Sequence, residues 1–597
     1  QTNSESNSTS AQHSLAKMGG NAEWPALFRT ASGGKASLVL EFGGQGFSYF
    51  SELKTILDEN PCVEGLFQRV AADLAVLGSH EAVHRELGRG LDLVAWMKNP
   101  PPTEYLERAP MAFPLIGLTQ MLMYYATLKR AGVSPAEARE LCSGAMGHSS
   151  GVCAATVAAA ATSFDHLEAL IADCTRYLFW HGVRCQQETP IHIMDPGLTK
   201  NAEKPSPMLS VRGVPVKLVE KAVDTYNKSL TTEQDKLKKS ITIGLVNGSD
   251  TTVVVGNEET VHTFATALQR KFPPAEDSQS RVPYSERKFS YTLEYLKVTT
   301  PFHSPLIAKA VPKIVEDASV SSPLFSALCG KDLAFPVFST VDGSDIRESE
   351  GTLLPHLVKM QVEEPLDWRK ATRSVGNTPT IIADFGPGGK KGVAAISNRY
   401  LGGRSISFVH ASPNGKVAKN YPNADLLFRA DATVAVPMSW EEEYSPRIAR
   451  VKDDIVIDNR YSRLLGAPPL LVAGMTPWSH YQQVAATNQA GYNSELAGGG
   501  IPLPHLFEKE IRDLAEIIPE GQGISCNLLF LNPYLWGFQF PLIEKLCQKG
   551  EPIDSVTVAA GVPGPEKAKE IIDSCKRSGM RYLSFKPGTA DAILQVL

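Results

Sequence analysis

The sequence predicts an α/β protein of two or more domains, in which parallel sheets are covered by helices. Three observations lead to this fold class. The chain has 597 residues, which is too long for a single hydrophobic core. A serine flanked by glycines lies between an apolar strand and an alanine-rich helix. Through residues 461–597, short apolar segments alternate with amphipathic helices, as in a β/α barrel.

The first strand-turn-helix unit contains the pentapeptide Gly147-His148-Ser149-Ser150-Gly151. We expect a strand over 141–146 and a helix over 152–161, joined by a tight turn from which the Ser149 hydroxyl projects. The positive end of the helix would face an oxyanion formed at Ser149, and the Ser150 N–H could donate to it. The pattern therefore predicts a serine nucleophile.

A serine nucleophile needs a base, and the chain has 13 histidines. His303 lies in an apolar stretch, 298–306, that is bracketed by prolines and is typical of a strand ending in a fixed turn. From the residues alone, a buried structural histidine is an equal alternative. His148 neighbours Ser149 in sequence but points elsewhere on the turn, so we interpret it as structural.

The G-H-S-x-G pentapeptide followed by Pro301-Phe302-His303-Ser304 resembles the acyltransferases that load acyl groups from coenzyme A onto acyl carrier protein. These enzymes serve fatty acid and polyketide synthases. Phe42-Gly43-Gly44-Gln45-Gly46 matches the G-Q-G segment of the family, which implies that the Gln45 N–H is the second oxyanion donor. The resemblance also implies a Ser-His dyad in which a backbone carbonyl orients the histidine. Ser150 replaces the usual glutamine or leucine, but only its N–H is needed.

A finer resemblance is to the fungal-type (type I) fatty acid synthase β chain, in its N-terminal acetyltransferase domain. It implies an α/β-hydrolase-like domain with an inserted ferredoxin-like subdomain. A coenzyme A thioester would be the substrate, and acyl carrier protein and the other synthase domains would be partners. Asn247, in the segment L-V-N-G, is implied in substrate binding. Further segments that carry the resemblance are 179–185, 205–210, 279–288, 342–345 and 384–389.

Residues after the nucleophile favour a short uncharged acyl group, such as acetyl, over malonyl. Malonyl-loading relatives carry an arginine about 26 residues after the serine, where it pairs with the substrate carboxylate. That position is Thr175 here, and Arg176 is turned by about 100° on a helix, away from the same pocket. Phe179 and Trp180 are bulky and apolar, and we assign all four residues to the substrate-binding region. A core position for the aromatics is the alternative.

Residues 206–300 show the order strand-helix-strand-strand-helix-strand, which is the ferredoxin-like pattern. The substrate cleft would lie between this unit and the domain that carries Ser149. Segment 384–389 is rich in glycine but lacks the ending of a P-loop, so we expect a turn near the cleft. Lys390 and Lys391, which follow it, would either meet a coenzyme A phosphate or be solvated. The expected strands are 208–211, 241–246, 252–255 and 293–298, and the expected helices are 216–226 and 260–271.

The C-terminal region is predicted to be a partial (β/α)8 (TIM) barrel with five of its strands. These strands are expected at 468–475, 493–496, 523–530, 554–561 and 582–587, with a helix at 505–518. We divide the chain into a disordered or extended tail (1–35), an acyltransferase domain (36–410, with subdomain 206–300), a linker (411–460) and the truncated barrel (461–597).

The strand ends of this barrel resemble the flavin-dependent enoyl reductase that follows the acetyltransferase in the fungal-type β chain. The resemblance implies that FMN would be lined, in the complete domain, by Gly474, Met475, Thr476, Asn527 and Lys586, with NADPH as the second cofactor. Glycines are also common at the strand ends of any barrel. The family's glycine- and histidine-rich loop would lie beyond Leu597, so we expect no enoyl reduction by this chain alone.

Charge, apolar stretches and cysteine spacing argue against several other kinds of partner and site. A net charge of −5 gives no sign of a nucleic acid or an anionic membrane as partner. The longest apolar stretch, after Gly151, is about a dozen residues and predicts no transmembrane segment. Nine cysteines without paired spacing argue against a metal site and a disulfide framework and fit the cytoplasm. The alternatives to an acetyl-loading acyltransferase are a malonyl or longer-chain starter transferase, a thioesterase-like hydrolase and an inactive structural fragment of a fatty acid synthase.

Overall fold

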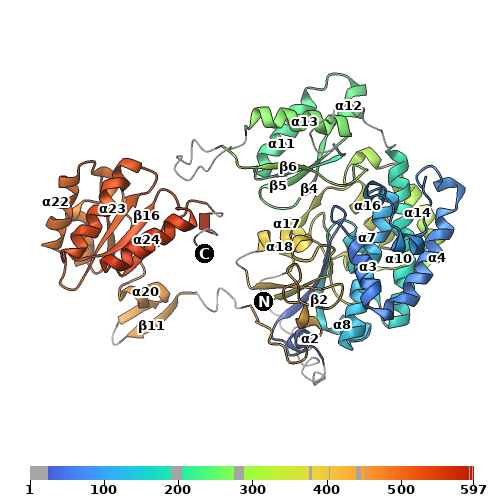
Figure 1. Cartoon of the computed structure of the whole chain (residues 1–597), viewed down its shortest axis with the longest axis horizontal. Coiled ribbons are helices and arrows are strands. Elements are labelled where there is room, and N and C mark those ends of the chain that lie inside the picture. Colours follow the sequence, from blue (N-terminus) through green and yellow to red (C-terminus); the bar gives the residue numbers. More distant parts are fainter. Residues whose placement is uncertain are drawn as a thin grey trace, which may run out of the picture. The chain divides into compact units, whose positions relative to one another are not determined.

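The computed structural model describes residues 24–189, 205–273, 288–375, 380–401, 404–437, 445–451 and 454–589, with residues 592, 593 and 596. The chain divides into two compact units (Figure 1). The first contains Gln1–Phe272 and Ser290–Trp440, and the second contains Pro273–Phe289 and Glu441–Leu597. Each unit has its own hydrophobic core.

A five-stranded parallel sheet forms the centre of the first unit, with the order β10-β9-β1-β2-β7. All but the first residue of β1 are buried, as expected for a strand covered on both faces. Because all strands run in one direction, the segments after β1, β2 and β9 leave the sheet at the same edge. The strands are β1 (Ser37–Phe42), β2 (Cys142–Gly147), β7 (Val337–Phe338), β9 (Thr380–Asp384) and β10 (Ile406–His410).

Two long helices, α7 (Ala109–Ala131) and α10 (Phe164–Glu188), pack against each other beside this sheet. Among the described residues, α7 is the one helix long and apolar enough to cross a membrane by length and composition. Our reading of the longest apolar stretch overlooked it. Its apolar window is completely buried inside the unit, which is the environment of a core helix.

The first unit extends beyond the predicted domain at both ends. Trp24 and Leu27 are buried in its core, and the Ala26 N–H donates to the Arg429 carbonyl, so residues 24–35 are not a tail. Leu427 is also buried, so the described residues 411–437 fold onto this unit and are not a linker. The expected tail over 1–23 lies outside the described residues.

Further helices belong to the α/β part of the first unit. They are α2 (Ala26–Ser32), α3 (Phe50–Glu59), α4 (Glu64–Gly78), α5 (Leu93–Lys98), α6 (Thr103–Leu106), α8 (Pro135–Leu141), α9 (Gly151–Ala160), α14 (Ala310–Ser321), α15 (Pro323–Ser326), α16 (Leu354–Val362), α17 (Trp368–Arg373) and α18 (Val393–Leu401).

A second sheet in the first unit has the order β6-β3-β5-β4-β8. Its first four strands pair antiparallel, and β8 (Leu366–Asp367) joins β4 in parallel. Helix α12, which we did not predict, lies between α11 and β4 in the chain. The other elements are β3 (Met208–Arg212), α11 (Val216–Lys228), α12 (Glu233–Lys239), β4 (Thr242–Val246), β5 (Thr251–Val255), α13 (Glu258–Lys271) and β6 (Thr292–Tyr295).

The second unit contains a parallel sheet in which each strand pairs with the next one along the chain, from β13 to β17. β13 is shorter than the predicted strand at both ends. Pro468 and Pro469 have no N–H for the ladder, and the N–H groups of Gly474 and Met475 donate to side chains. The elements are β11 (Arg447–Val451), β12 (Asp454–Asp458), α20 (Arg460–Leu465), β13 (Leu471–Val472), α21 (Tyr481–Gln489), β14 (Asn493–Ala497), α22 (Pro504–Ala515), β15 (Ile524–Leu529), α23 (Pro533–Gln548), β16 (Ile553–Ala559), α24 (Pro565–Ser578) and β17 (Tyr582–Phe585).

Candidate active site

The turn between β2 and α9 holds Ser149 in a left-handed backbone conformation, with φ of 53°. A Cβ atom at Gly147 would lie 2.1 Å from the Val152 nitrogen, and one at Gly151 would lie 2.3 Å from the Gly43 carbonyl oxygen. Only glycine fits at these two positions. The turn is therefore held tightly between its own helix and the segment that follows β1, which fixes the direction of the serine side chain.

His303 lies within hydrogen-bond distance of the serine. Ser149 Oγ is 2.9 Å from His303 Nε2, and His303 Nδ1 is 3.0 Å from the Glu364 carbonyl oxygen. A carbonyl only accepts hydrogen bonds, so Nδ1 carries the proton and Nε2 presents its lone pair to the Ser149 hydroxyl. Burial lowers the pKa of His303 to about 4, against the opposing effect of the Glu364 carbonyl. The imidazole is thus neutral near pH 7 and can accept a proton.

Two backbone donors lie next to the nucleophile without an acceptor. The N–H groups of Ser150 and Gln45 donate to no residue in the described ranges. They follow β2 and β1, whose last residues, Gly147 and Phe42, pair in the sheet. The His148 N–H donates to the Phe42 carbonyl at 2.8 Å, which ties the two segments together. Free donors at this place can stabilise an oxyanion.

Gln120 fixes the segment that carries Gln45. Its side-chain amide donates to the Gly43 carbonyl at 2.6 Å and to the Gly386 carbonyl at 2.9 Å. Gln120 is fully buried in α7, and sequence reasoning missed it. The available signal was a glutamine inside an apolar helix, because a buried amide must find hydrogen-bond partners.

The structure brings Asn247, at the end of β4, to the nucleophile turn. His148 Nε2 and Asn247 Oδ1 are 2.9 Å apart, and the His148 ring lies edge-on to Trp368 at 5.1 Å between centroids. Burial lowers the pKa of His148, and the bond to Asn247 opposes this effect. His148 therefore links the turn to the second sheet, whereas the Ser149 hydroxyl pairs with His303.

Two cavities adjoin this arrangement, and the segment from Gln45 to Phe47 lines both. The larger has a volume of about 340 Å³ and is also lined by His148 and Asn247. The smaller has a volume of about 240 Å³, and its lining combines apolar side chains such as Ile116 of α7 with the charged Glu107 and Lys297. A ligand in the larger cavity would lie beside the nucleophile turn.

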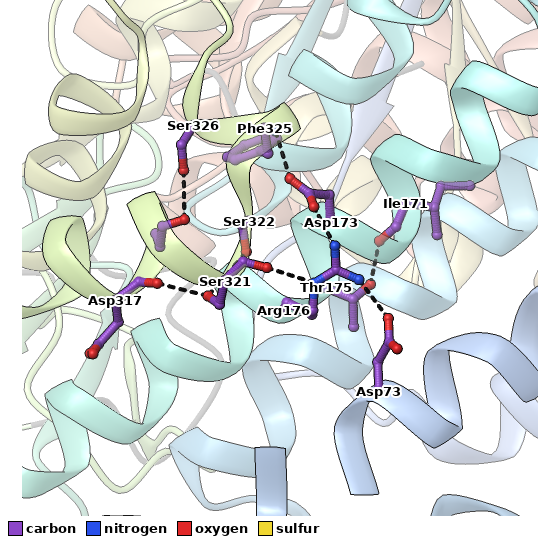
Figure 2. A network of polar contacts seen from close by, with 11 residues as sticks. Asp73, Ile171, Asp173, Thr175, Arg176, Asp317, Ser321, Ser322, Phe325 and Ser326 are labelled. Atoms are coloured by element: carbon purple, nitrogen blue, oxygen red, sulfur yellow. Dashed lines mark hydrogen bonds and ion pairs between the residues drawn. The ribbon is translucent and has the colours of Figure 1, made fainter. Parts of the chain in front are cut away.

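Arg176 is held in an ion-pair network and does not line either cavity (Figure 2). Its guanidinium contacts Asp73 of α4 at 2.5 Å and Asp173 of α10, and its Nε donates to the Ser321 carbonyl at 2.7 Å. Asp173 also accepts from the Phe325 N–H at 2.8 Å. These contacts fix α10 against α4 and α14. The assignment of Arg176 to substrate binding was wrong, because its donors are already committed to acidic partners.

The other three residues of the predicted pocket also lie outside both cavities. The Thr175 hydroxyl donates to the Ile171 carbonyl at 2.7 Å within its own helix, and Thr175 is fully buried (Figure 2). Phe179 is fully buried, and the Trp180 ring packs on His80 and Arg184. The alternative reading, in which the aromatics belong to the core, matches these contacts.

The face of α10 that lies near His303 carries Tyr177 and His181, which sequence reasoning did not single out. His181 stacks on Phe113 at 4.7 Å, and its Nδ1 is 3.1 Å from the Tyr177 hydroxyl. Burial, with a smaller contribution from His303, lowers the pKa of His181 to about 3. The i, i+4 spacing of Tyr177 and His181 was the signal, because such residues share a helix face.

Comparisons with known proteins agree over most of the chain. A family model described as "Starter unit:ACP transacylase in aflatoxin biosynthesis" matches residues 40–288. The fatty acid synthase beta subunit aflB of Emericella nidulans is 37% identical over 94% of this chain and 26% of its own length. The fatty acid synthase subunit beta of Saccharomyces cerevisiae is 34% identical over 96% of this chain and 28% of its own length. The chain is a homologue of fungal fatty acid synthase β subunits.

This β-subunit homologue spans less than a third of the length of either relative. The structure of the malonyl CoA-acyl carrier protein transacylase (fabD) from Coxiella burnetii matches it with a TM-score of 0.45 and 17% identity. That match covers 66% of this chain and 96% of the other.

The strand ends in the second unit of the synthase homologue converge on a buried carboxylate. Glu495 accepts from the Gly474 N–H at 2.9 Å, from the Asn527 amide at 2.7 Å and from the Thr557 hydroxyl at 2.5 Å. Sequence reasoning missed Glu495 as the centre of this cluster, although it included Gly474 and Asn527. The available signal was an acidic residue in a strand that the sequence predicts to be buried.

The remaining residues assigned to flavin lie around this cluster or apart from it. The Met475 N–H donates to the Ser479 hydroxyl at 2.9 Å, and Met475 is exposed. Thr476 is in the same segment after β13. Lys586 is exposed after β17, at the opposite edge strand of the sheet. The structure therefore brings Gly474 and Asn527 together but leaves Lys586 at the far edge.

Proposed function

We propose that this chain is an acyl-CoA:acyl carrier protein S-acyltransferase that primes fatty acid synthesis through an acyl-Ser149 intermediate. The observation that carries the proposal is the chain of hydrogen bonds from Ser149 Oγ to His303 Nε2 and from His303 Nδ1 to the Glu364 carbonyl. The free N–H groups of Ser150 and Gln45 supply the second requirement of acyl transfer. The similarity to a starter unit:ACP transacylase family and to fatty acid synthase β subunits supports the same reaction class.

In the first half-reaction, His303 Nε2 accepts the proton of Ser149 while Oγ attacks the carbonyl carbon of the thioester. The N–H groups of Ser150 and Gln45 donate to the oxyanion. When the carbon–sulfur bond breaks, His303 returns the proton to the departing thiolate of coenzyme A. In the second half-reaction, His303 takes the proton of the carrier's phosphopantetheine thiol, the sulfur attacks the acyl group, and Ser149 leaves with the proton.

We propose a short uncharged starter, acetyl first, as the acyl group. A malonyl carboxylate needs a cation to pair with, and Arg176 is bound by Asp73 and Asp173. His181, on the face of α10 near His303, is kept neutral by burial. Neither Arg176 nor His181 of α10 therefore offers a free positive charge to a malonyl carboxylate.

The finer fold assignments are also proposals. The antiparallel order β6-β3-β5-β4, with α11 and α13 in the connections, supports a ferredoxin-like subdomain. The sequential parallel order from β13 to β17, with a helix after each of the first four strands, supports the first part of a β/α barrel. We therefore propose an acyltransferase domain that ends near residue 437 and a partial reductase-like barrel from about residue 461.

The strand ends of the second unit do not fit FMN, because the groups expected to bind it already have partners. The Gly474 N–H and the Asn527 amide donate to Glu495, and the Met475 N–H donates to Ser479, so these groups are not free for a ligand. We propose that enoyl reduction is not an activity of this chain alone. We also propose a cytoplasmic location, because the nine cysteines have no paired spacing in the sequence.

Incubation with acetyl-CoA carrying a radiolabel in the acetyl group tests the acyltransferase. We expect a stable label on the wild-type chain, its loss in Ser149→Ala, and its transfer to added holo acyl carrier protein. Ser143→Ala, a change of β2 that leaves the turn intact, is the matched control. Rapid release of free acetate would favour a hydrolase, and the absence of label would favour an inactive fragment. Stronger labelling by malonyl-CoA would overturn the acetyl proposal.

A further inference from the structure

The larger cavity beside the nucleophile turn has two unpaired cations on one wall. Lys391 ends a short helical turn, Gly389–Lys391, and Arg399 lies on α18. Both side chains are exposed, both line the cavity, and neither forms an ion pair or side-chain hydrogen bond within the described residues. Lys390, which the sequence also suggested, does not line the cavity.

The backbone that carries these cations is fixed. The Gly388 N–H donates to the Glu52 carboxylate at 2.7 Å, and the Lys390 N–H donates to the Asn420 carbonyl at 2.9 Å. On α18, the Ser397 hydroxyl donates to Glu41 of β1 and accepts from the Trp368 indole N–H. The wall is thus preorganised, and only the Lys391 and Arg399 side chains remain free to move onto a ligand.

The lining residues that come from the second sheet include both acidic and basic side chains. Arg212 pairs with Glu294 at 3.0 Å, so these two charges compensate each other. Asp250 also lines the cavity, and its carboxylate accepts from the Thr251 hydroxyl at 3.1 Å. An anionic ligand would therefore avoid the wall of Asp250 and approach the wall of Lys391 and Arg399.

We propose that Lys391 and Arg399 bind the phosphate groups attached to the pantetheine arm of the thioester. The inference rests on the proposed function, because it places the thioester end of the ligand beside Gln45 and His148, which line the same cavity. An arginine fork and a lysine ammonium are the usual partners of phosphate. The shared chemistry is a phosphorylated pantetheine, carried either by coenzyme A or by acyl carrier protein.

The test uses the double variant Lys391→Gln/Arg399→Gln in the full chain. We expect the KM of acetyl-CoA for Ser149 loading to rise about tenfold or more, since each lost charged contact weakens binding by roughly that factor. Loading from acetyl-pantetheine, which has no phosphate, stays unchanged. An equal rise with acetyl-phosphopantetheine assigns the site to the shared phosphate, and a rise with acetyl-CoA alone assigns it to the nucleotide phosphates.

The control is Lys54→Gln/Arg373→Gln, which removes two exposed cations of the same unit that line neither cavity. An unchanged KM for acetyl-CoA in the cavity variant, or an equal loss with acetyl-pantetheine, overturns the inference and leaves the acyltransferase standing. Calorimetric titration with coenzyme A gives a second readout that needs no turnover. If the wild-type chain loads no thioester, the proposed function fails. The calorimetric affinity for coenzyme A would then still show whether Lys391 and Arg399 bind its phosphates.

Discussion

The two units differ in whether the hydrogen-bond donors at their strand ends have acceptors. In the first, the N–H groups of Ser150 and Gln45 remain without an acceptor in the described residues, beside a serine held at φ of 53°. In the second, the donors of Gly474 and Asn527 are both taken by Glu495. Open donors can stabilise a charge that forms during a reaction, whereas satisfied donors hold a scaffold together. Glycines and polar residues at strand ends therefore do not identify a site until the partners of their donors are known.

Removal of the Glu495 carboxylate should give the largest effect, a loss of stability in the second unit. Glu495→Ala leaves three donors without their acceptor, and each costs about 1–3 kcal/mol when buried, so we expect the second unit to lose roughly 3 kcal/mol or more of unfolding free energy. Loading of Ser149 should not change. Urea denaturation followed by tryptophan fluorescence, with a parallel loading assay, measures both.

The matched control is Glu516→Ala, which removes an exposed carboxylate of the second unit. A full loss of Ser149 loading in folded Glu495→Ala protein would contradict the separation of scaffold and site.

Acid should inactivate the first site at an unusually low pH. The pKa of His303 is about 4, so the rate constant of Ser149 loading should stay flat from about pH 8 to 5 and fall roughly tenfold per unit below pH 4. The unfolded chain binds the proton with an ordinary pKa of about 6.5, so acidification from 6.5 toward 4 also destabilises the fold. Brief pH jumps followed by quenching separate the two effects. A midpoint near 6.5 for loading would show that His303 is not held neutral by burial.

Loss of Asn247 should give the smallest of these effects. Asn247→Ala removes the partner of His148 Nε2, and an unpaired buried imidazole costs about 1–2 kcal/mol, which corresponds to roughly a tenfold slower loading of Ser149. Single-turnover loading measures this change. Asn257→Ala, which removes the N-cap of α13 in the same subdomain, should lower stability but leave loading intact. Equal rates in both variants would remove Asn247 from the site.

The sequence predicted the parts of the site that depend on local backbone geometry. The turn at Ser149 needs glycine at 147 and 151, and adjacent parallel strands place Gln45 beside it, so chain order and glycine spacing carried enough information. The pairing of Ser149 with His303 came from a family resemblance, because nothing local connects residues 154 positions apart. The strands of both predicted sheets were found within a few residues because their apolar patterns are strong.

The sequence could not predict which neighbouring elements each face of α10 contacts. Thr175, Arg176, Phe179 and Trp180 were assigned to a pocket, but the acidic partners of Arg176 come from α4 and from α10 itself. A single sequence gives the period of a helix but not which neighbour each face meets. Gln120 and Glu495 were missed for a related reason. Their importance depends on donors and acceptors from distant segments, which only the folded chain brings together.

The side-chain amide of Gln120 joins two segments with separate tasks. This one buried amide donates to the carbonyls of Gly43 and Gly386. Gly43 lies just before the Gln45 donor, and Gly386 lies just before the turn that carries Lys391. The proposed oxyanion donor and the proposed phosphate-binding cations therefore stand at a fixed separation. A ligand must span that separation to use both ends, so the length of its pantetheine arm becomes a criterion of selection alongside the acyl group.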